Sequence, residues 1–340
     1  MMSAESTLQP GAPAGASGMS NDRPASPATT RAIAFVAEHK PAAEALGVAL
    51  ADHIGDPDDF ATTLRRGFER LADPAYLEGQ HFVAPGLGLV HGVRWPLMAA
   101  VARGFRTATR RDPSGPLLYV ADRLFREEHL EARWFAFGLL QRTLPTDPER
   151  SWQLLRRAAR EAGDWITIDD LAHPYAAGIS AEPYRWAELE QLVFSPSRWE
   201  RRLVGSTIAT MTHGARGKRL GPEIARLALP ILGQLMGDAD PDVQKALAWA
   251  YRSLAQVDLD ATTQALERET RTAAATADGH RAWVIRDSLA KLDAATAARI
   301  RDTLEGIRKR PGAPSTSPAA ETAARFGELP DPVHHPEPPL

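Results

Sequence analysis

The stretch Asp240-Pro-Asp-Val-Gln-Lys-Ala-Leu-Ala-Trp-Ala-Tyr-Arg-Ser-Leu254 carries the pattern that decides the fold. Asp240 offers a side chain that caps the start of a helix, and Pro241 suits the first helical position, where its missing N–H has no intrahelical partner. Apolar residues then follow at helical spacing: Val243, Leu247 and Leu254. We therefore predict an α-helix over residues 240–257.

The same kind of start, a capping residue followed by proline, occurs earlier at Asp147-Pro148 and Ser195-Pro196. The three starts are 48 and 45 residues apart. This spacing is close to the roughly 40 to 47 residues of HEAT and armadillo units, in which pairs of antiparallel helices stack on their neighbours. The predicted pairs are 147–162 with 164–178, 183–193 with 195–213, and 221–236 with 240–257.

Helical spacing of apolar residues continues on both sides of these pairs. Further helices are expected at residues 31–54, 58–72, 96–110, 115–126, 128–144, 260–275 and 280–308. No segment has a convincing strand pattern, and residues 75–95 are poorly patterned. The sequence therefore predicts an all-α fold, a HEAT-like or armadillo-type α-α superhelix that forms a solenoid of antiparallel helix pairs.

The two ends of the chain lack this periodicity. Residues 1–30 are rich in Ala, Ser, Pro and Gly, and residues 311–340 are rich in proline. We therefore expect a disordered N-terminal extension (1–30), one helical-repeat domain (31–310) and a disordered Pro-rich tail (311–340).

Composition excludes several classes of function. The absence of cysteine excludes disulfides, thiolate catalysis and cysteine-ligated zinc, and the ten histidines form no H-E-x-x-H cluster, so no metal or cofactor is expected. The chain has no apolar run of the roughly 18 residues that span a bilayer and no secretory pattern, which favours a cytoplasmic protein without a membrane partner. The net charge of −3 arises at the ends, and the near-neutral middle permits a DNA-binding face.

Aromatic and charged residues recur on three of the predicted helices. Trp165 precedes Asp169 by four residues and so shares a helical face with it. Trp199 and Arg202 share a face in the same way, and Trp249 lies on the next repeat. One helix of each pair lines the concave side of a superhelix, so these residues are expected to converge on one ligand. A carboxylate among indoles and a guanidinium suits a cationic ligand beside a phosphate, which makes damaged DNA the leading candidate.

Each of these residues also has a simpler explanation. A single tryptophan on a helix is most often part of the core. That role is expected of three other tryptophans: Trp152, Trp186 and Trp283. Asp169 is followed by Asp170, and Arg202 is preceded by Arg201, so the neighbour in each pair competes for the role.

Three segments carry a more specific pattern: Trp165-Ile-Thr-Ile-Asp169-Asp-Leu-Ala-His-Pro174, Arg198-Trp199-Glu-Arg-Arg202 and Val243-Gln-Lys-Ala-Leu-Ala-Trp249-Ala-Tyr-Arg252. Their order and spacings resemble the alkylpurine DNA glycosylases of the AlkD type, which are HEAT-like repeat proteins. The resemblance extends upstream through Gly92-Val-Arg94-Trp-Pro96 and Glu131-Ala-Arg133 and covers roughly residues 57–290. The N-terminal extension and the Pro-rich tail have no counterpart in the family core.

The resemblance implies roles for individual residues. Asp169 is expected to be the catalytic carboxylate, with Trp165 and Trp249 as aromatic walls against the lesion-bearing nucleotide. Arg202 is expected to clamp the DNA backbone. Further DNA contacts are expected from Trp199, Lys245 and Arg252 and, on the separate ground that three basic residues share a glycine-bearing turn, from Arg216, Lys218 and Arg219. The alternative role for Trp199 is packing. For Arg216, Lys218 and Arg219, the alternative is a solvated loop without DNA contact.

The resemblance implies that the protein hydrolyses the N-glycosidic bond of cationic N3- or N7-alkylated purines in duplex DNA, as a monomer in base excision repair. Asp169 would stabilise the oxocarbenium-like transition state and position water. Two alternatives stay open: a non-catalytic HEAT-repeat protein that binds distorted or branched DNA, and a protein-interaction solenoid. The sequence leaves open whether methyl or bulky adducts are preferred.

Overall fold

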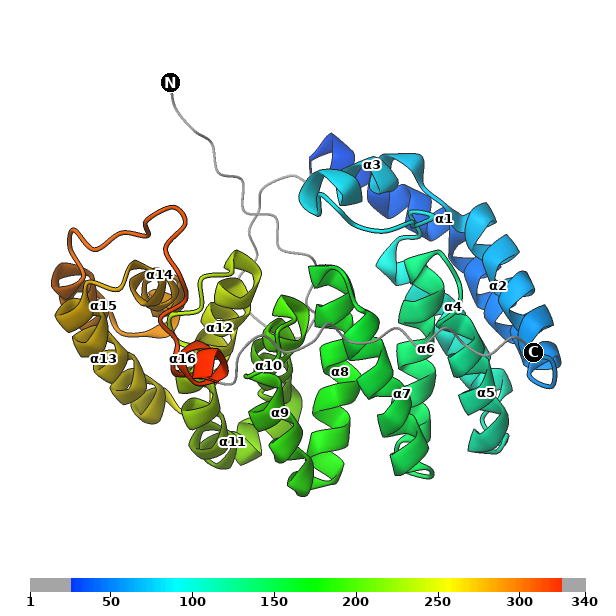
Figure 1. Cartoon of the computed structure of the whole chain (residues 1–340). Helices are drawn as coiled ribbons and strands as arrows, with labels where there is room; N and C mark the ends of the chain where they lie inside the picture. The colour runs from blue at the N-terminus through cyan, green and yellow to red at the C-terminus, as the bar shows by residue number, and fades with distance from the viewer. Residues whose placement is uncertain (1–25, 326–340) are drawn as a thin grey trace. The chain divides into compact units, whose positions relative to one another are not determined.

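The computed structural model of the chain describes residues 26–325 (Figure 1). These residues form sixteen α-helices and three short 3-10 helices, and they contain no strand, only one isolated β-bridge between Ala72 and Val93. The predicted all-α fold is confirmed. No helix within this described range is long and apolar enough to cross a membrane, and it holds no cluster of three side chains suited to a metal ion.

The first six α-helices are α1 (Pro27–Ala49), α2 (Pro57–Leu71), α3 (Pro74–Val83), α4 (Trp95–Ala108), α5 (Ser114–Leu124) and α6 (Leu130–Thr143). The three predicted pairs are present as α7 (Pro148–Glu161) with α8 (Trp165–Ala181), α9 (Trp186–Leu192) with α10 (Arg198–Met211), and α11 (Gly214–Leu235) with α12 (Pro241–Leu254). The last helices are α13 (Leu259–Thr276), α14 (Gly279–Ser288), α15 (Ala294–Thr303) and α16 (Pro318–Arg325). The 3-10 helices are η1 (Leu50–His53), η2 (Pro183–Arg185) and η3 (Leu289–Lys291).

Two of the three predicted capping residues start their helices as expected. The Asp240 carboxylate accepts the N–H of Asp242 at 2.8 Å, and the Asp147 carboxylate accepts that of Arg150 at 3.4 Å. The third start is displaced, because the Ser195 hydroxyl accepts the N–H of Ser197 in a turn and α10 begins only at Arg198.

Other predicted boundaries were wrong for local reasons. The single helix expected at residues 280–308 is interrupted, because the Asp293 carboxylate accepts the Thr296 N–H at 2.9 Å and starts α15 anew. The expected turn at residues 214–219 is the beginning of α11, whose basic residues there are good helix formers.

The helices within residues 39–325 belong to one unit and are stacked in two rows (Figure 1). Helices α6, α8, α10, α12 and α14 contact one another in succession and make the first row. Helices α5, α7, α9, α11 and α13 make the second row, and each contacts its partner in the first. Between the rows lie fully buried side chains such as those of Leu171, Leu203 and Leu247. This arrangement is that of HEAT-like repeats, and it brings α8, α10 and α12 side by side.

A buried carboxylate fixes the loop that leads into α4. Glu131, at the start of α6, is fully buried and accepts backbone N–H groups of His91 (3.1 Å), Gly92 (2.8 Å) and Val93 (3.3 Å). Its burial raises the pKa of the carboxyl, and the three N–H donors oppose that rise. The Glu131-Ala-Arg133 segment of the family resemblance therefore has a structural role.

Replacing Glu131 by glutamine should lower the free energy of unfolding by about 2 to 3 kcal/mol. The new amide NH₂ group cannot accept a hydrogen bond, so a buried backbone N–H group loses its partner. Urea unfolding monitored by circular dichroism measures this difference. The matched control is Glu128→Gln, since Glu128 is exposed only three residues away. Equal stability of the two variants would contradict the role of Glu131.

The structure differs from the prediction at both predicted ends of the repeat domain. Helix α1 begins at Pro27, and α16 packs against α11 beyond residue 311. The Thr316 N–H donates to Gly237 O at 2.9 Å, and the Ser315 hydroxyl accepts the Ala239 N–H at 2.9 Å. Isolated hydrogen bonds of this kind hold an extended segment without any periodic apolar pattern. The rest of the two predicted tails, residues 1–25 and 326–340, lies outside the described residues.

Candidate functional site

Helix α8 presents three residues of the predicted site region on one face. Trp165, Asp169 and His173 follow one another at intervals of four residues, and all three are half-buried. The helix is held at its start by Asp164, whose carboxylate accepts the Thr167 N–H at 2.8 Å. The start of α8 is therefore fixed, and its first two turns carry the indole of Trp165 and the carboxylate of Asp169.

The Asp169 carboxylate is held by two residues of α10. Arg202 donates from Nε to Oδ1 at 3.1 Å and from Nη2 to Oδ2 at 2.7 Å, and the Ser206 hydroxyl donates to Oδ1 at 2.7 Å. Two parallel bonds from a planar guanidinium fix both the position and the orientation of a carboxylate. The Asp169 side chain keeps 23% of its surface exposed, whereas that of Arg202 keeps 6%.

Arg202 also ties the site to the next repeat. Its Nη1 donates to the backbone oxygen of Asp242, in the first turn of α12, at 2.7 Å. Its guanidinium carbon lies 5.8 Å from the centre of the Trp165 ring. Three predicted site residues, Trp165, Asp169 and Arg202, are thus brought together. Arg202 is mostly committed to protein partners, which differs from the clamp on the DNA backbone that the resemblance implies.

The structure also separates the two neighbours that competed for these roles. Asp170 is half-buried, and its carboxyl has no hydrogen-bond partner within residues 26–325. Burial, followed by the charge of Asp169, raises the pKa of this carboxyl to about 7. Arg201 points to a different carboxylate, that of Asp238, at 2.7 Å. Asp169 and Arg202 are therefore the pair that meets across α8 and α10.

Trp249 lies on α12, half-buried, with its ring centre 6.3 Å from that of His213. Burial lowers the pKa of His213, and burial followed by the charge of His213 lowers the pKa of His173. Both shifts favour the neutral form of the imidazole. Sequence reasoning gave no role to either histidine, although the spacing of His173 from Asp169 places it on the same helical face.

The remaining predicted DNA contacts are spread over the surface. Trp199 is half-buried, and the guanidinium carbon of Arg198 lies 4.5 Å from the centre of its ring. Lys245 is exposed on α12. Arg252 donates to Asp287 O at 2.7 Å and to its carboxylate at 2.5 Å, so a neighbouring acid already partners it.

Arg216, Lys218 and Arg219 lie exposed on α11, in the second row. Arg216 donates to the backbone oxygen of Ser180, near the carboxyl end of α8. Because Trp165 begins α8, fifteen residues earlier, this contact lies roughly 22 Å along the helix from it. The structure does not bring these three bases together with Asp169.

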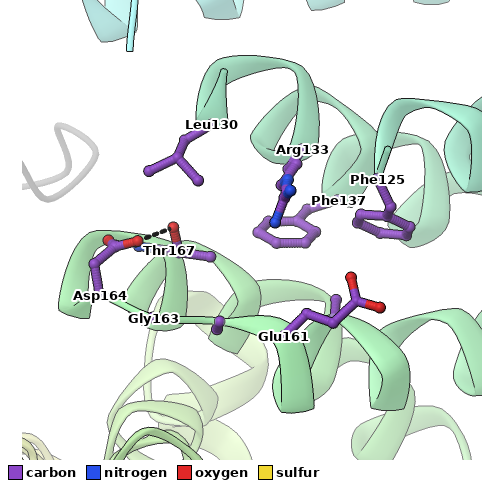
Figure 2. A pocket seen from close by; sticks show the side chains of 10 residues that line it. Phe125, Leu130, Arg133, Phe137, Glu161, Gly163, Asp164 and Thr167 are labelled. Atoms are coloured by element: carbon purple, nitrogen blue, oxygen red, sulfur yellow. Dashed lines mark hydrogen bonds between the residues drawn. The ribbon is translucent and has the colours of Figure 1, made fainter. Parts of the chain in front are cut away.

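Two cavities of the described residues lie away from Asp169. One, of about 20 Å³, is lined mainly by residues of α6, α7 and the turn into α8, and Figure 2 shows Leu130 facing the hydrogen-bonded Asp164 and Thr167 across it. It has room for about one water molecule. The other, of about 350 Å³, lies between α4 and α6 and includes Phe105 and Phe135. The Asp169 site is instead a half-open face on the first row of helices.

Comparison with known proteins agrees with this arrangement. The family model described as DNA alkylation repair enzyme matches residues 64–292, from α2 to the end of η3, which is more than half of the chain and includes Asp169, Arg202 and Trp249. No curated protein matches the chain. The chain therefore belongs to the family of DNA alkylation repair enzymes, as its resemblance to AlkD-type proteins predicts, and DNA is its substrate.

Proposed function

We propose that this enzyme is a DNA glycosylase that hydrolyses the N-glycosidic bond of cationic N3- or N7-alkylated purines in duplex DNA, as a monomer without a cofactor. The observation that carries the proposal is the Asp169 carboxylate, held by Arg202 and Ser206 beside Trp165 on a half-open face. A fixed anion next to an aromatic ring suits a ligand that is positively charged.

The chemistry needs no acid catalyst. An alkylated purine already carries a positive charge, so it leaves as a neutral base with the electron pair of the C1′–N bond. Positive charge then develops on the deoxyribose, and a preorganised carboxylate nearby lowers the barrier. Water adds to C1′ and loses a proton, which leaves an abasic site and the free alkylated base.

Asp169 can also position the attacking water and accept its proton. Its Oδ1 accepts two hydrogen bonds and its Oδ2 only one, so Oδ2 keeps a lone pair for a water molecule. The proposed general-base action places that water for attack at C1′. Arg202 is proposed as a positioning residue for Asp169, because its burial favours this role over a clamp on the DNA backbone.

Trp165 and Trp249 are proposed to contact the cationic base and its sugar. Replacing either by alanine should lower the rate of 7-methylguanine release by about 2- to 30-fold, which corresponds to a cation–π contribution of roughly 0.5 to 2 kcal/mol. Single-turnover assays with a duplex that carries one 7-methylguanine measure this rate. Trp165→Phe is the control, because phenylalanine retains a π face; equal losses for phenylalanine and alanine would indicate packing instead.

The proposed function is tested directly by product identification. Purified full-length protein is incubated with duplexes that each carry one defined adduct, from 3-methyladenine and 7-methylguanine to bulky N7 adducts, and every liberated base is identified by mass spectrometry. Release of cationic purines, and of no unmodified base, is the expected result. Binding to damaged or branched duplexes without any release would overturn the proposal in favour of a non-catalytic DNA-binding role.

A further inference from the structure

The segment after α15 returns across the ends of α12 and α14. We call residues 305–317 the C-terminal strap. The His280 Nε2 lies 3.1 Å from Ala313 O, and Arg286 Nη2 donates to Ile307 O at 2.8 Å. The Thr316 hydroxyl donates to the Asp278 carboxylate, which adds to its backbone bond with Gly237. The strap is thus fastened at several points along its length.

Two glycines let the strap lie this close. A Cβ on Gly279 would overlap the backbone oxygen of Arg308, and a Cβ on Gly237 would overlap the Thr316 hydroxyl. Gly237 also has a φ of +98°, which L side chains rarely adopt. The backbone of α14 and the turn before α12 are therefore shaped to receive the strap.

The strap carries the basic tract Arg308-Lys309-Arg310, and all three residues are exposed. Lys309 anchors the tract: its Nζ donates to Gln244 Oε1 at 2.8 Å and lies 4.4 Å from the centre of the Trp283 ring. Sequence reasoning placed Trp283 in the core, whereas the structure leaves it half-buried beneath this lysine.

Two further positive charges, Lys245 and Arg286, lie close to the basic tract. Partial desolvation against Gln244 and Trp283, then the charge of Lys245, lowers the pKa of Lys309. Partial desolvation, then the charge of Arg308, lowers the pKa of Arg286. Within residues 26–325, no carboxylate forms an ion pair with the strap's basic tract or with Lys245. Such a surface favours a polyanion.

This surface adjoins the Asp169 site through α12. Arg202 binds the backbone oxygen of Asp242, and Gln244, two residues later in the same helical turn, binds Lys309. Neighbouring packed helices lie roughly 8 to 10 Å apart, so the two helix steps from α8 to α12 span about 16 to 20 Å. That distance corresponds to about five or six base pairs at 3.4 Å each. This separation is within the length of a short duplex.

We propose that the C-terminal strap extends the DNA-binding surface, with Arg308 and Arg310 contacting phosphates of the duplex flanking the lesion and Lys309 fastening the tract beside Lys245. The inference rests on the proposed function for the position of the lesion at Asp169. It concerns a feature outside the family match, which ends at residue 292. The contact is independent of base sequence and supplies affinity on one side of the damaged nucleotide.

The experiment compares Arg308→Gln/Arg310→Gln with a control of equal charge change, Arg268→Gln/Arg271→Gln, whose arginines are exposed on α13 in the second row. Binding of the full-length protein to a 20-base-pair duplex is measured by fluorescence anisotropy over a series of salt concentrations. Losing two phosphate contacts should reduce the slope of log affinity against log salt by about 2 and weaken binding about tenfold or more near 0.15 M salt. The control should leave both unchanged.

A second variant tests the fastening itself. Gly279→Ala should displace the strap and lower the salt slope even though it changes no charge; circular dichroism verifies that the helices persist. If Arg308→Gln/Arg310→Gln binds with the wild-type slope, or if the α13 control loses as much, the inference is overturned. Either result leaves base release by the wild-type protein intact. Conversely, an absence of base release would overturn the proposed function while the salt slope still reports on the strap.

Discussion

Replacing Asp169 by asparagine is expected to reduce the release of 7-methylguanine from duplex DNA by about 10²- to 10³-fold, the scale on which removal of one preorganised electrostatic group slows a reaction. Asparagine has nearly the same shape as aspartate but no charge. It therefore cannot stabilise an electron-poor sugar or accept a proton from water. Single-turnover rates with excess enzyme measure the chemical step, and anisotropy with the same duplex should show nearly unchanged binding.

The neighbouring acid provides the control for this experiment. Asp170→Asn changes the charge by the same amount one residue away, but Asp170 does not contact Arg202, and its pKa is raised to about 7 by burial. Its release rate should remain close to that of the wild type. A comparable loss in both variants, or an unchanged rate for Asp169→Asn, would contradict the role of Asp169.

The Asp170→Asn variant should also change how the stability of the fold depends on pH. A carboxyl whose pKa is raised in the folded state, here from 3.8 to about 7, stabilises the fold below about pH 4 and loses that contribution as the pH rises through 7. Asp170→Asn should therefore be more stable than the wild type at pH 8, and the difference should shrink toward pH 4. Thermal unfolding at several pH values measures this trend.

The repeat architecture could be predicted because it depends on sequence signals within single helices. Capping residues at Asp147 and Asp240 and the apolar spacing between them are short-range signals, and they place the helix pairs within a few residues. The start at Ser195 was wrong by two residues, since a serine hydroxyl serves a turn as readily as a helix cap.

The site was only partly predictable. Spacing places Trp165 and Asp169 on one face, but Asp169 and Asp170 differ by a rotation of roughly 100° about the helix axis, and only packing against α10 decides which one meets Arg202. The strap was not predictable, because Thr316 and Lys309 make their contacts with residues 79 and 65 positions earlier and leave no periodic signal.

Replacing Arg202 by methionine is expected to have two separable effects. It removes three hydrogen bonds and leaves the Asp169 carboxylate without its cation, and breaking a pair of which one partner is buried should lower the free energy of unfolding by about 3 kcal/mol. The carboxylate also loses the fork that orients it, so the single-turnover rate at saturating DNA should fall by at least about tenfold, the loss associated with a misplaced catalytic group.

Arg201→Met is the matched control for Arg202→Met. Arg201 pairs with Asp238 and is also partly buried, so its loss should reduce stability without slowing base release. Arg202→Lys should recover part of the rate, because lysine restores the charge but not the two-point contact. The saturating rate and the salt slope distinguish the two roles of Arg202. A positioning residue changes the rate at saturation and leaves the slope of log affinity against log salt intact. A wild-type rate at saturation, together with a slope smaller by about 1, would instead establish Arg202 as a clamp on one phosphate.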